Sequence, residues 1–292
     1  MAVVKGSKPF TSEQVESYRG RGYYFPIRAF SDAETSEFRG YFDDYYAYHS
    51  EALKSLPANR HVSIYGHTHM FLGWVYRMIA HSNVLEAVES VLGPNLLVRD
   101  SGWFVKMPGD KKYISWHQDA TYWCLHPPKV TTAWIALSES TPENGCMRVV
   151  PGSQQNPILP HHETYAPENA LSRGQEIAVE VDEKQAVDIV LAPGEMSLHD
   201  IAIVHGSKAN TSDKPRIGLA VRYMPPEVVQ DGEVRQLALL VRGKDHFGHV
   251  DLIDPPVQND PSKDAMRVES LDRLFRNAQS LGAGGSAPEV KH

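Results

Sequence analysis

Ser-Trp-His-Gln-Asp-Ala-Thr, residues 115–121, is the stretch from which the fold and the site of this chain can be predicted. Successive side chains of a β-strand alternate between its two faces, so residues two apart point the same way. We therefore expect His117 and Asp119 to hold one metal ion together while Gln118 faces elsewhere. Two ligands do not complete such a site, so a third must come from another strand. His205, in Ile203-Val-His-Gly-Ser207, is the candidate.

Two histidines and one carboxylate on one face of an iron ion leave the opposite face open, which is typical of non-haem Fe(II) oxygenases. The His-x-acid pattern alone is weak evidence, because chance predicts roughly two matches in a chain of this composition. The match at residue 117 stands out because it lies in a strand-like run and is followed by His205-Gly-Ser and then by Arg216. The chain contains these matches: His49/Glu51, His117/Asp119, His161/Glu163 and His249/Asp251.

The bulk composition excludes several classes of partner. The chain has 292 residues, 41% hydrophobic and 22% charged, which is ordinary for a globular protein with a large core. Its net charge of −7, without a basic stripe, argues against a nucleic-acid surface. No apolar run approaches the roughly 20 residues that span a bilayer, and residues 1–8 lack the apolar core of a signal peptide. With only Cys124 and Cys146, we expect no disulfide framework, no membrane partner and a reducing, cytoplasmic location.

Short strand-like runs follow one another through the middle of the chain. Turn residues separate them, as in Pro108-Gly-Asp110 and Glu143-Asn-Gly145, and this spacing predicts an antiparallel barrel or jelly roll. We therefore expect a mainly β fold with flanking α-helices. The predicted strands cover residues 96–106, 113–119, 130–137, 146–150, 187–191, 196–200, 203–210 and 216–224.

Helices are predicted mainly before these strands. Capping boxes at Thr11-Ser-Glu-Gln14 and Ser31-Asp-Ala-Glu34 begin the first two, with a strand at 23–27 between them. Asn83 is the expected cap of a later helix. The predicted helices cover residues 11–19, 31–49, 71–79, 83–92 and 264–281.

We expect residues 1–292 to form a single domain. Its parts are a helical N-terminal support (1–95), a β core (96–225) and a C-terminal segment (226–292) that wraps the surface, ends in a helix and becomes disordered from residue 282. Residues 152–185 are too long for a hairpin connection, and such loops are often functional, so we predict a lid over the site. We expect residues 55–70 to form a loop with a surface or lid role. This loop contains His61, His67 and His69.

Period-two alternation predicts which side chains face the interior. Tyr113 and Ser115 should share the face of His117, and on the last strand Arg216 should share a face with Gly218, Ala220 and Arg222. A buried arginine is costly unless it meets an anion. A dicarboxylate cosubstrate would supply one, because its far carboxylate can form a bidentate pair with Arg216. The alternative is an internal salt bridge with one of the chain's own acids.

Over about residues 95–225, and more loosely to the N-terminus, the chain resembles the phytanoyl-CoA dioxygenase family of Fe(II)/2-oxoglutarate oxygenases. No single motif is specific, but their order is. The motifs are Phe104-Val-Lys106-Met-Pro108, Trp116-His-Gln-Asp119, Ala133-Trp-Ile-Ala136, Glu143-Asn-Gly-Cys146, Val150-Pro-Gly-Ser153 and His205-Gly-Ser207, ending in Arg216.

The resemblance implies a double-stranded β-helix, the cupin-like jelly roll, with a catalytic iron on His117, Asp119 and His205. It also implies 2-oxoglutarate held by Arg216 and Ser207, with Lys106 and Trp134 nearby. The implied reaction uses O2, converts 2-oxoglutarate to succinate and CO2, and hydroxylates a small-molecule metabolite, with ascorbate as the reductant in vitro. Related halogenases lack the carboxylate ligand, so Asp119 favours hydroxylation or a related oxidation. Without the resemblance, Lys106 reads as a snorkelling surface lysine and Trp134 as ordinary core.

The substrate is not named by any motif. Aromatic residues near the expected metal suggest a pocket for a flat, cationic or sugar-like molecule, although aromatics also fill barrels. An acyl-CoA would need a basic rim that this acidic chain does not offer. Two alternatives stay open, a cupin-like metalloenzyme that does not use 2-oxoglutarate and a catalytically silent small-molecule-binding barrel. The aromatic candidates are Trp103, Tyr113, Tyr122 and Trp123.

Overall fold

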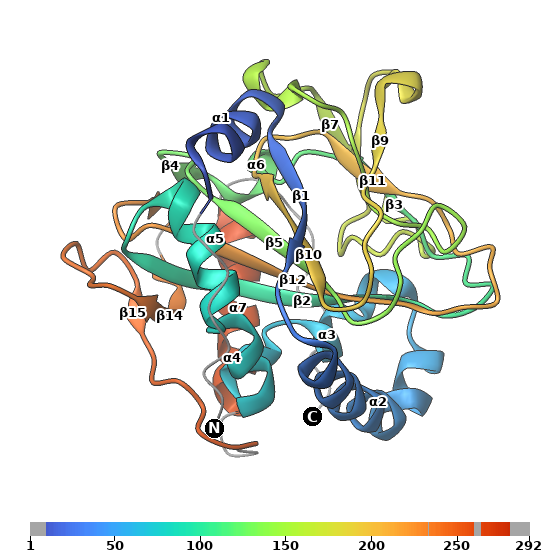
Figure 1. Ribbon diagram of the computed structural model, residues 1–292, viewed down its shortest axis with the longest axis horizontal. Coiled ribbons are helices and arrows are strands. Elements are labelled where there is room, and N and C mark those ends of the chain that lie inside the picture. The colour runs from blue at the N-terminus through green and yellow to red at the C-terminus, as the bar shows by residue number, and fades with distance from the viewer. Residues whose placement is uncertain (1–9, 233, 260–263, 281–292) are drawn as a thin grey trace.

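The computed structural model describes residues 10–232, 234–259 and 264–280 and is built on two main β-sheets (Figure 1). All eight predicted strands of the core are present, most of them shorter than expected. The strands are β1 (Tyr23–Arg28), β2 (Leu96–Lys106), β3 (Ile114–His117), β4 (Leu125–His126), β5 (Thr131–Ala136), β6 (Arg148–Val149), β7 (His161–Glu163), β8 (Gln175–Ile177), β9 (Val187–Asp188), β10 (Glu195–Asp200), β11 (His205–Ser207), β12 (Arg216–Met224), β13 (Val229–Gln230), β14 (Leu237–Arg242) and β15 (Asp251–Leu252).

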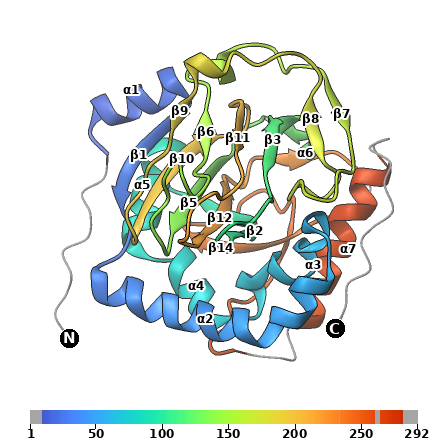
Figure 2. The same cartoon turned by 90° about the vertical axis from the view of Figure 1, so that its right-hand side faces the viewer.

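The large sheet has the strand order β1-β10-β5-β12-β2-β14-β15, and the small sheet has the order β3-β11-β6-β9. Figure 2 shows the strands of the small sheet next to one another above the large sheet. Trp134 and Ala220 of the large sheet pack together with Val149 of the small sheet, so the two inner faces enclose a common interior. This arrangement is the expected jelly roll, a mainly β fold with flanking helices.

Helices precede and follow the strands, and both predicted capping boxes are present at Thr11 and Ser31. The second helix continues to Ser55, past the expected end at residue 49. The prediction that Asn83 caps the later helix is wrong. The His81 side chain is the cap, because it accepts from the backbone N–H of Asn83, and the Asn83 side chain instead donates to the Ala29 carbonyl. The helices are α1 (Ser12–Arg21), α2 (Asp32–Ser55), α3 (Val62–Tyr65), α4 (Gly73–Ile79), α5 (Ser82–Leu92), α6 (Ala120–Trp123) and α7 (Asp264–Ser280), with 3₁₀ turns η1 (Ala58–Arg60), η2 (Thr68–Met70), η3 (Ser153–Gln155) and η4 (Glu183–Gln185).

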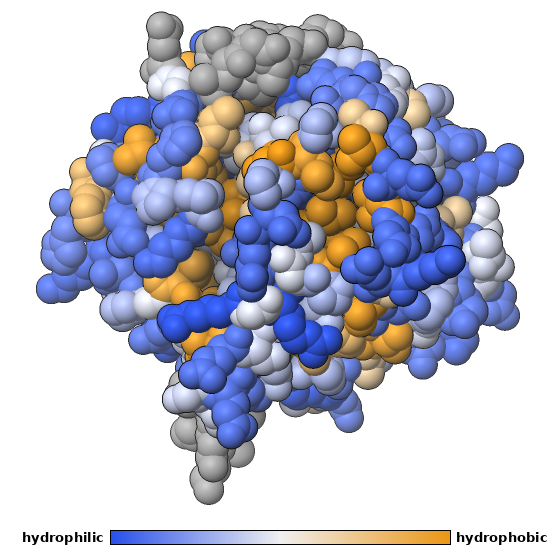
Figure 3. Space-filling view, turned by 90° about the horizontal axis from the view of Figure 1, so that it is seen from above, coloured by the Kyte–Doolittle hydropathy of each residue, from blue (hydrophilic) through white to orange (hydrophobic). Residues whose placement is uncertain are grey.

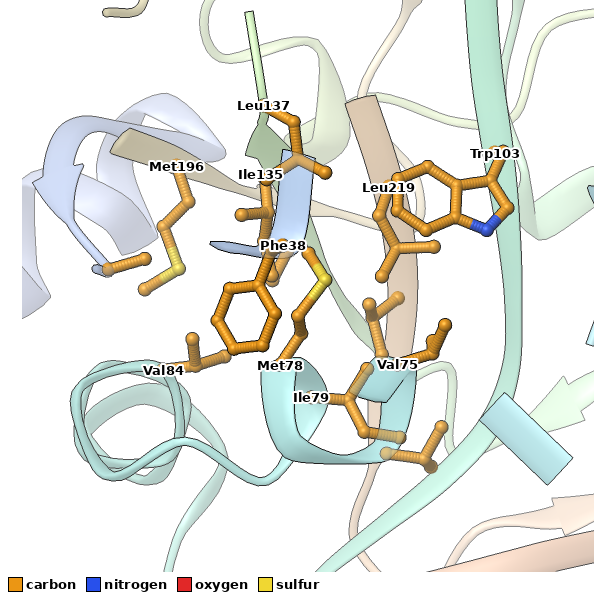
Figure 4. Close-up of a cluster of buried hydrophobic side chains, with 14 of the residues drawn as sticks. Phe38, Val75, Met78, Ile79, Val84, Trp103, Ile135, Leu137, Met196 and Leu219 are labelled. Carbon is orange, nitrogen blue, oxygen red and sulfur yellow. The ribbon is translucent and has the colours of Figure 1, made fainter. Parts of the chain in front are cut away.

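The main hydrophobic core lies between the helices and the outer face of the large sheet. Phe38 of α2, Met78 of α4 and Val84 of α5 pack against side chains of β5, β10 and β12 (Figure 4). The opposite face of the same strands is turned toward the small sheet, as alternation along a strand requires. The helices therefore cover one side of the large sheet and leave the other side to form the interior cavity.

Two segments differ from the expectation. Residues 58–70 form short helical turns instead of a loop, and His67 and His69 are buried, so their surface reading is wrong. The imidazole of His67 is hydrogen-bonded to Ser270 of α7, which explains its burial. The tail also does more than wrap the surface, because β14 pairs with β2 and extends the large sheet. The prediction of disorder from residue 282 lies outside the described residues.

The surface seen from above is mainly hydrophilic, with apolar residues showing between polar ones (Figure 3). Among the described residues, no helix is long and apolar enough to cross a membrane.

Candidate metal and cosubstrate site

Three buried side chains with metal-ligating atoms converge at the mouth of the jelly roll. His205 begins β11 and lies directly opposite His117, the last residue of β3. Asp119 follows β3 in a helical conformation (φ −58°, ψ −35°), so the expectation that it belongs to the strand is wrong. One ligating atom of each residue lies within 4.8 Å of the others.

A turn, and not strand alternation, brings Asp119 back to His117. The turn is held at Gln118, which is fully buried and donates its side-chain amide to the Ala202 carbonyl over 2.7 Å. Its side-chain oxygen accepts from the backbone N–H of Leu159 over 2.9 Å. The carboxylate of Asp119 consequently lies 3.4 Å from Nε2 of His117.

Both histidine rings are oriented by backbone carbonyls. Nδ1 of His117 lies 2.9 Å from the Ser115 carbonyl, and Nδ1 of His205 lies 3.0 Å from the Ile203 carbonyl. A carbonyl only accepts, so each Nδ1 carries the hydrogen and each Nε2 keeps a lone pair for a metal. Two imidazole nitrogens and one carboxylate oxygen are a donor set that suits iron, so the residues present fit this ion.

The protonation states agree with this use. Burial would raise the pKa of Asp119, but the adjacent rings of His117 and His205 hold it below its usual range. Burial, followed by the proximity of His117, lowers the pKa of His205 well below its usual value. An ionised carboxylate and a neutral imidazole are the forms that bind a metal.

An inner pocket, partly open to solvent, extends from the two histidines between the sheets to Arg216. Arg216 begins β12 and is 2% exposed. Its Nη1 donates to the Gly145 carbonyl, whereas its buried Nε has no partner within the described part of the chain. No carboxylate of the described residues forms an ion pair with Arg216, so the internal salt bridge is not seen there. The guanidinium is thus a buried cation beside a cavity, as a carboxylate site requires.

Lys106 lies directly opposite Arg216 in the neighbouring strand β2. It is 1% exposed, which rules out the snorkelling reading, and its Nζ donates to Ser207 Oγ over 2.6 Å. Burial, followed by the nearby charge of Arg216, lowers the pKa of Lys106 to about 5. The lysine positions the Ser207 hydroxyl on the pocket wall.

Trp134 forms another wall of the inner pocket. The Arg216 guanidinium lies over its ring, 5.4 Å from the ring centroid. A Cβ atom at Gly218 would lie only 2.0 Å from the same ring, so the strand needs glycine at this position. Trp134 is therefore both a core residue and a pocket residue.

A wider cleft of about 1070 Å³, partly open to solvent, includes Asp119 and shares His117, Arg216 and Arg222 with the inner pocket. Trp103, Tyr122 and Trp123 line this cleft as expected, whereas Tyr113 lines an outer groove with Trp116. The reason is a β-bulge in β3, which pairs His117 with His205 but Ile114 with Ser207.

The same bulge overturns the predicted face for Tyr113 and Ser115. It places Ile114 beside His117 on the cavity wall. The hydroxyl of Ser115 instead donates to the Gln175 carbonyl.

Three site residues were not identified from the sequence, namely His199, Arg99 and Asp100, whereas Arg222 is one of the residues that alternation predicts to face the interior with Arg216. His199 of β10 lies with its ring centroid 4.9 Å from that of His205, and its buried Nδ1 has no partner among the described residues. Arg99, Asp100 and Arg222 line the wide cleft. Alternation along 196–200 would have placed His199 on the inner face, because it pairs with Thr132, two residues from Trp134.

Both predicted cover segments border the wide cleft. Ala58, Tyr65 and His67 of the first segment and Leu171 and Gln175 of the second line it. Their mobility stays a prediction.

Comparisons with known proteins agree with this geometry. A family model described as "Phytanoyl-CoA dioxygenase (PhyH)" matches residues 4–218. Phytanoyl-CoA dioxygenase of Arabidopsis thaliana is 26% identical over 184 residues, which is 63% of this chain and 64% of that protein. A probable alpha-ketoglutarate-dependent hypophosphite dioxygenase of Stutzerimonas stutzeri is 26% identical over 162 residues, 53% of this chain and 54% of that protein.

The solved structure of a non-heme monooxygenase, apo ThoJ, matches with a TM-score of 0.79 and 30% identity, over 92% of this chain and 99% of that chain. The chain thus matches the structural relative over nearly its whole length, but it spans only 64% and 54% of the length of these two curated relatives.

Proposed function

Because the chain belongs to the phytanoyl-CoA dioxygenase family, we propose that it is an Fe(II)- and 2-oxoglutarate-dependent dioxygenase that hydroxylates a small molecule. The observation that carries the proposal is the convergence of His117, Asp119 and His205 at the end of a pocket that contains Arg216. The names of the hypophosphite dioxygenase and of the non-heme monooxygenase support an oxygenase of this class.

His117, Asp119 and His205 are the residues that would hold Fe(II). When bound there, the ion would supply activation of O2 coupled to oxidative decarboxylation of 2-oxoglutarate to succinate and CO2. The protein contributes the fixed geometry, since the Ser115 and Ile203 carbonyls orient the two imidazoles.

Arg216 would bind the far carboxylate of 2-oxoglutarate in the inner pocket. Its planar guanidinium offers parallel N–H donors, and a bound carboxylate would offset the cost of burying this charge. Ser207 Oγ accepts from Lys106, which leaves its own hydrogen free to be donated to the same carboxylate. Trp134 fixes the guanidinium plane from one side.

The substrate would enter through the wide cleft, on the side of His117 and Asp119 that faces Trp123. The lining segments from 55–70 and 152–185 would exclude water while the substrate is bound. Related halogenases lack the carboxylate ligand, so the presence of Asp119 favours hydroxylation over halogenation.

The experiment that tests the proposal incubates the protein with Fe(II), ascorbate and 2-oxoglutarate, and measures succinate with and without a panel of metabolites. The expected result is slow succinate formation alone and faster formation with a substrate. Substrate oxidation without succinate would favour a metalloenzyme that does not use 2-oxoglutarate. The absence of both succinate and an oxidised substrate would favour a silent binding barrel. His205→Ala should abolish succinate formation, whereas His126→Ala, at an exposed site on β4, is the matched control.

A further inference from the structure

We infer that the primary substrate carries an anionic group, a carboxylate or a phosphate, that binds to Arg99 and Arg222 in the wide cleft. This inference rests on the proposed function, because it assigns the substrate side of the same site. It differs from the flat, cationic or sugar-like molecule suggested by the aromatic residues, because Arg99 and Asp100 were not predicted from the sequence to line the cleft.

A backbone irregularity places two consecutive residues of β2 at the cleft. Arg222 pairs with Asp100, but the next residue of β12, Tyr223, pairs with Val98, so Arg99 is the extra residue of a β-bulge. Bulges interrupt the hydrogen-bond ladder and redirect a side chain, and they are frequent beside active sites. Here the bulge allows both Arg99 and Asp100 to line the cleft, which regular alternation would forbid.

The resulting cluster carries an excess of positive charge. Asp100 accepts from Arg99 Nη1 and also lies 3.1 Å from Nη1 of Arg222, so one carboxylate is shared by two guanidiniums. Burial would raise the pKa of Asp100, but Arg222 and Arg99 hold it below its usual range, so it is ionised.

The neighbouring charged groups do not remove this excess. Lys112, also on the cleft wall, is paired with Asp110 over 2.7 Å. Burial lowers the pKa of His67 to about 4, so this imidazole is neutral. Asp119 faces the proposed metal and is committed there.

The two guanidiniums retain unused donors. Arg99 is 3% exposed, and its Nε and Nη2 have no hydrogen-bond partner within the described residues. The same holds for Nε of Arg222. Buried donors without partners are uncommon because each one costs free energy, so a cluster of them beside a cavity points to a ligand that accepts.

Aromatic rings fix both arginines. The Cζ atoms of Arg99 and Arg222 lie 5.0 Å and 5.5 Å from the ring centroid of Trp123. Arg222 also lies 5.7 Å from the ring of Phe104. Stacked guanidiniums are pre-organised, so they lose little freedom when they bind an anion. An arginine pair held in this way is typical of carboxylate and phosphate recognition.

The test measures binding to protein that is loaded with Fe(II) and saturated with 2-oxoglutarate under argon, so that the cosubstrate pocket is already filled. The probes are phenylacetate, phenyl phosphate and neutral phenylacetamide, whose ring suits the aromatic wall, and calorimetry gives their affinities. We expect at least one anion to bind about tenfold tighter than the amide. The tighter anion distinguishes a carboxylate from a phosphate substrate.

Variants separate recognition from a structural role. Arg99→Gln should reduce the affinity for the anion to that for the amide and leave the affinity for 2-oxoglutarate unchanged. Asp100→Asn should increase the affinity for the anion and not the affinity for the amide, because it removes the competing carboxylate. A merely structural role would change both affinities in the same direction. The control is Arg39→Gln, which removes an ion pair between Arg39 and Asp43 on the surface of α2.

Any of three results would overturn the inference. The wild-type protein could bind the anions and the amide with equal affinity, it could bind neither anion measurably, or its preference for the anion could survive Arg99→Gln. The wild-type comparison decides even if a variant fails to fold. Failure of 2-oxoglutarate to bind the iron-loaded protein would instead refute the proposed function, so the two failures are distinguishable.

Discussion

Replacing Arg216 with alanine tests the cosubstrate site most sharply. The side chain is 2% exposed, and among the described residues no carboxylate forms an ion pair with it, so 2-oxoglutarate would be its counter-ion. Truncating one member of a buried charged pair costs about 2–5 kcal/mol, which corresponds to roughly 30- to 4,000-fold in affinity. Arg216→Ala should therefore raise the Kd for 2-oxoglutarate by a factor in this range and leave metal binding nearly unchanged.

Lys106 decides where in this range the variant lies. Its pKa of about 5 is set by burial and then by the charge of Arg216, so removing Arg216 should raise this pKa. A partly protonated Lys106 would then bind the carboxylate in place of the arginine, more strongly as the pH falls. We expect Arg216→Ala to lie at the lower end of the range, and Arg216→Ala combined with Lys106→Met to lie at the upper end.

The assay is calorimetric titration of 2-oxoglutarate into iron-loaded protein under argon, with metal content measured separately. Arg28→Ala, at a half-exposed arginine on β1, is the matched control. If Arg216→Ala keeps its Kd within about threefold of wild type, under one kcal/mol, then Arg216 does not hold the cosubstrate or 2-oxoglutarate is not the cosubstrate.

Three further predictions concern the metal, the pocket wall and the pH dependence of folding. Asp119→Ala should lose iron binding without a lower melting temperature of the metal-free protein; retained iron affinity would contradict its role. Gly218→Ala places a Cβ atom 2.0 Å from the Trp134 ring, so it should cost about 1–3 kcal/mol of stability in denaturant unfolding. Burial raises the pKa of Asp200 to about 6, so its contribution to stability falls as the pH rises from about 4 through 6. Asp200→Asn should flatten this decline in thermal melts and raise the melting temperature above pH 7; an unchanged profile would contradict the assignment.

Much of the fold could be predicted because alternation and turn residues are local signals. The strands at 96–106 and 216–224 were recovered almost to the residue, because they are long and end at clear turns. β14 (Leu237–Arg242) was missed because prolines and aspartates dominate its surroundings and because its pairing with β2 is a tertiary contact. Asn83 was assigned as a cap on residue type alone, but its side chain is used by a distant carbonyl.

The site was predicted where ordered motifs marked it and missed where the backbone is irregular. His117, Asp119, His205 and Arg216 belong to such motifs; the structure brings the first three together and places Arg216 on the inner pocket that the two histidines also line. Bulges moved Tyr113 away from the cavity and brought Arg99 to it. A bulge depends on the register between two strands, which a single sequence does not display.

The central claim is that Fe(II) on His117, Asp119 and His205 binds 2-oxoglutarate. Its most direct test is anaerobic addition of 2-oxoglutarate to the Fe(II)-loaded protein while the visible absorption spectrum is recorded, because a keto acid that chelates Fe(II) produces a charge-transfer band. We predict that the band appears in the wild-type protein, saturates at one 2-oxoglutarate per chain, and is absent from His205→Ala. Iron binding without any such band, or an equal band in His205→Ala, would contradict the account.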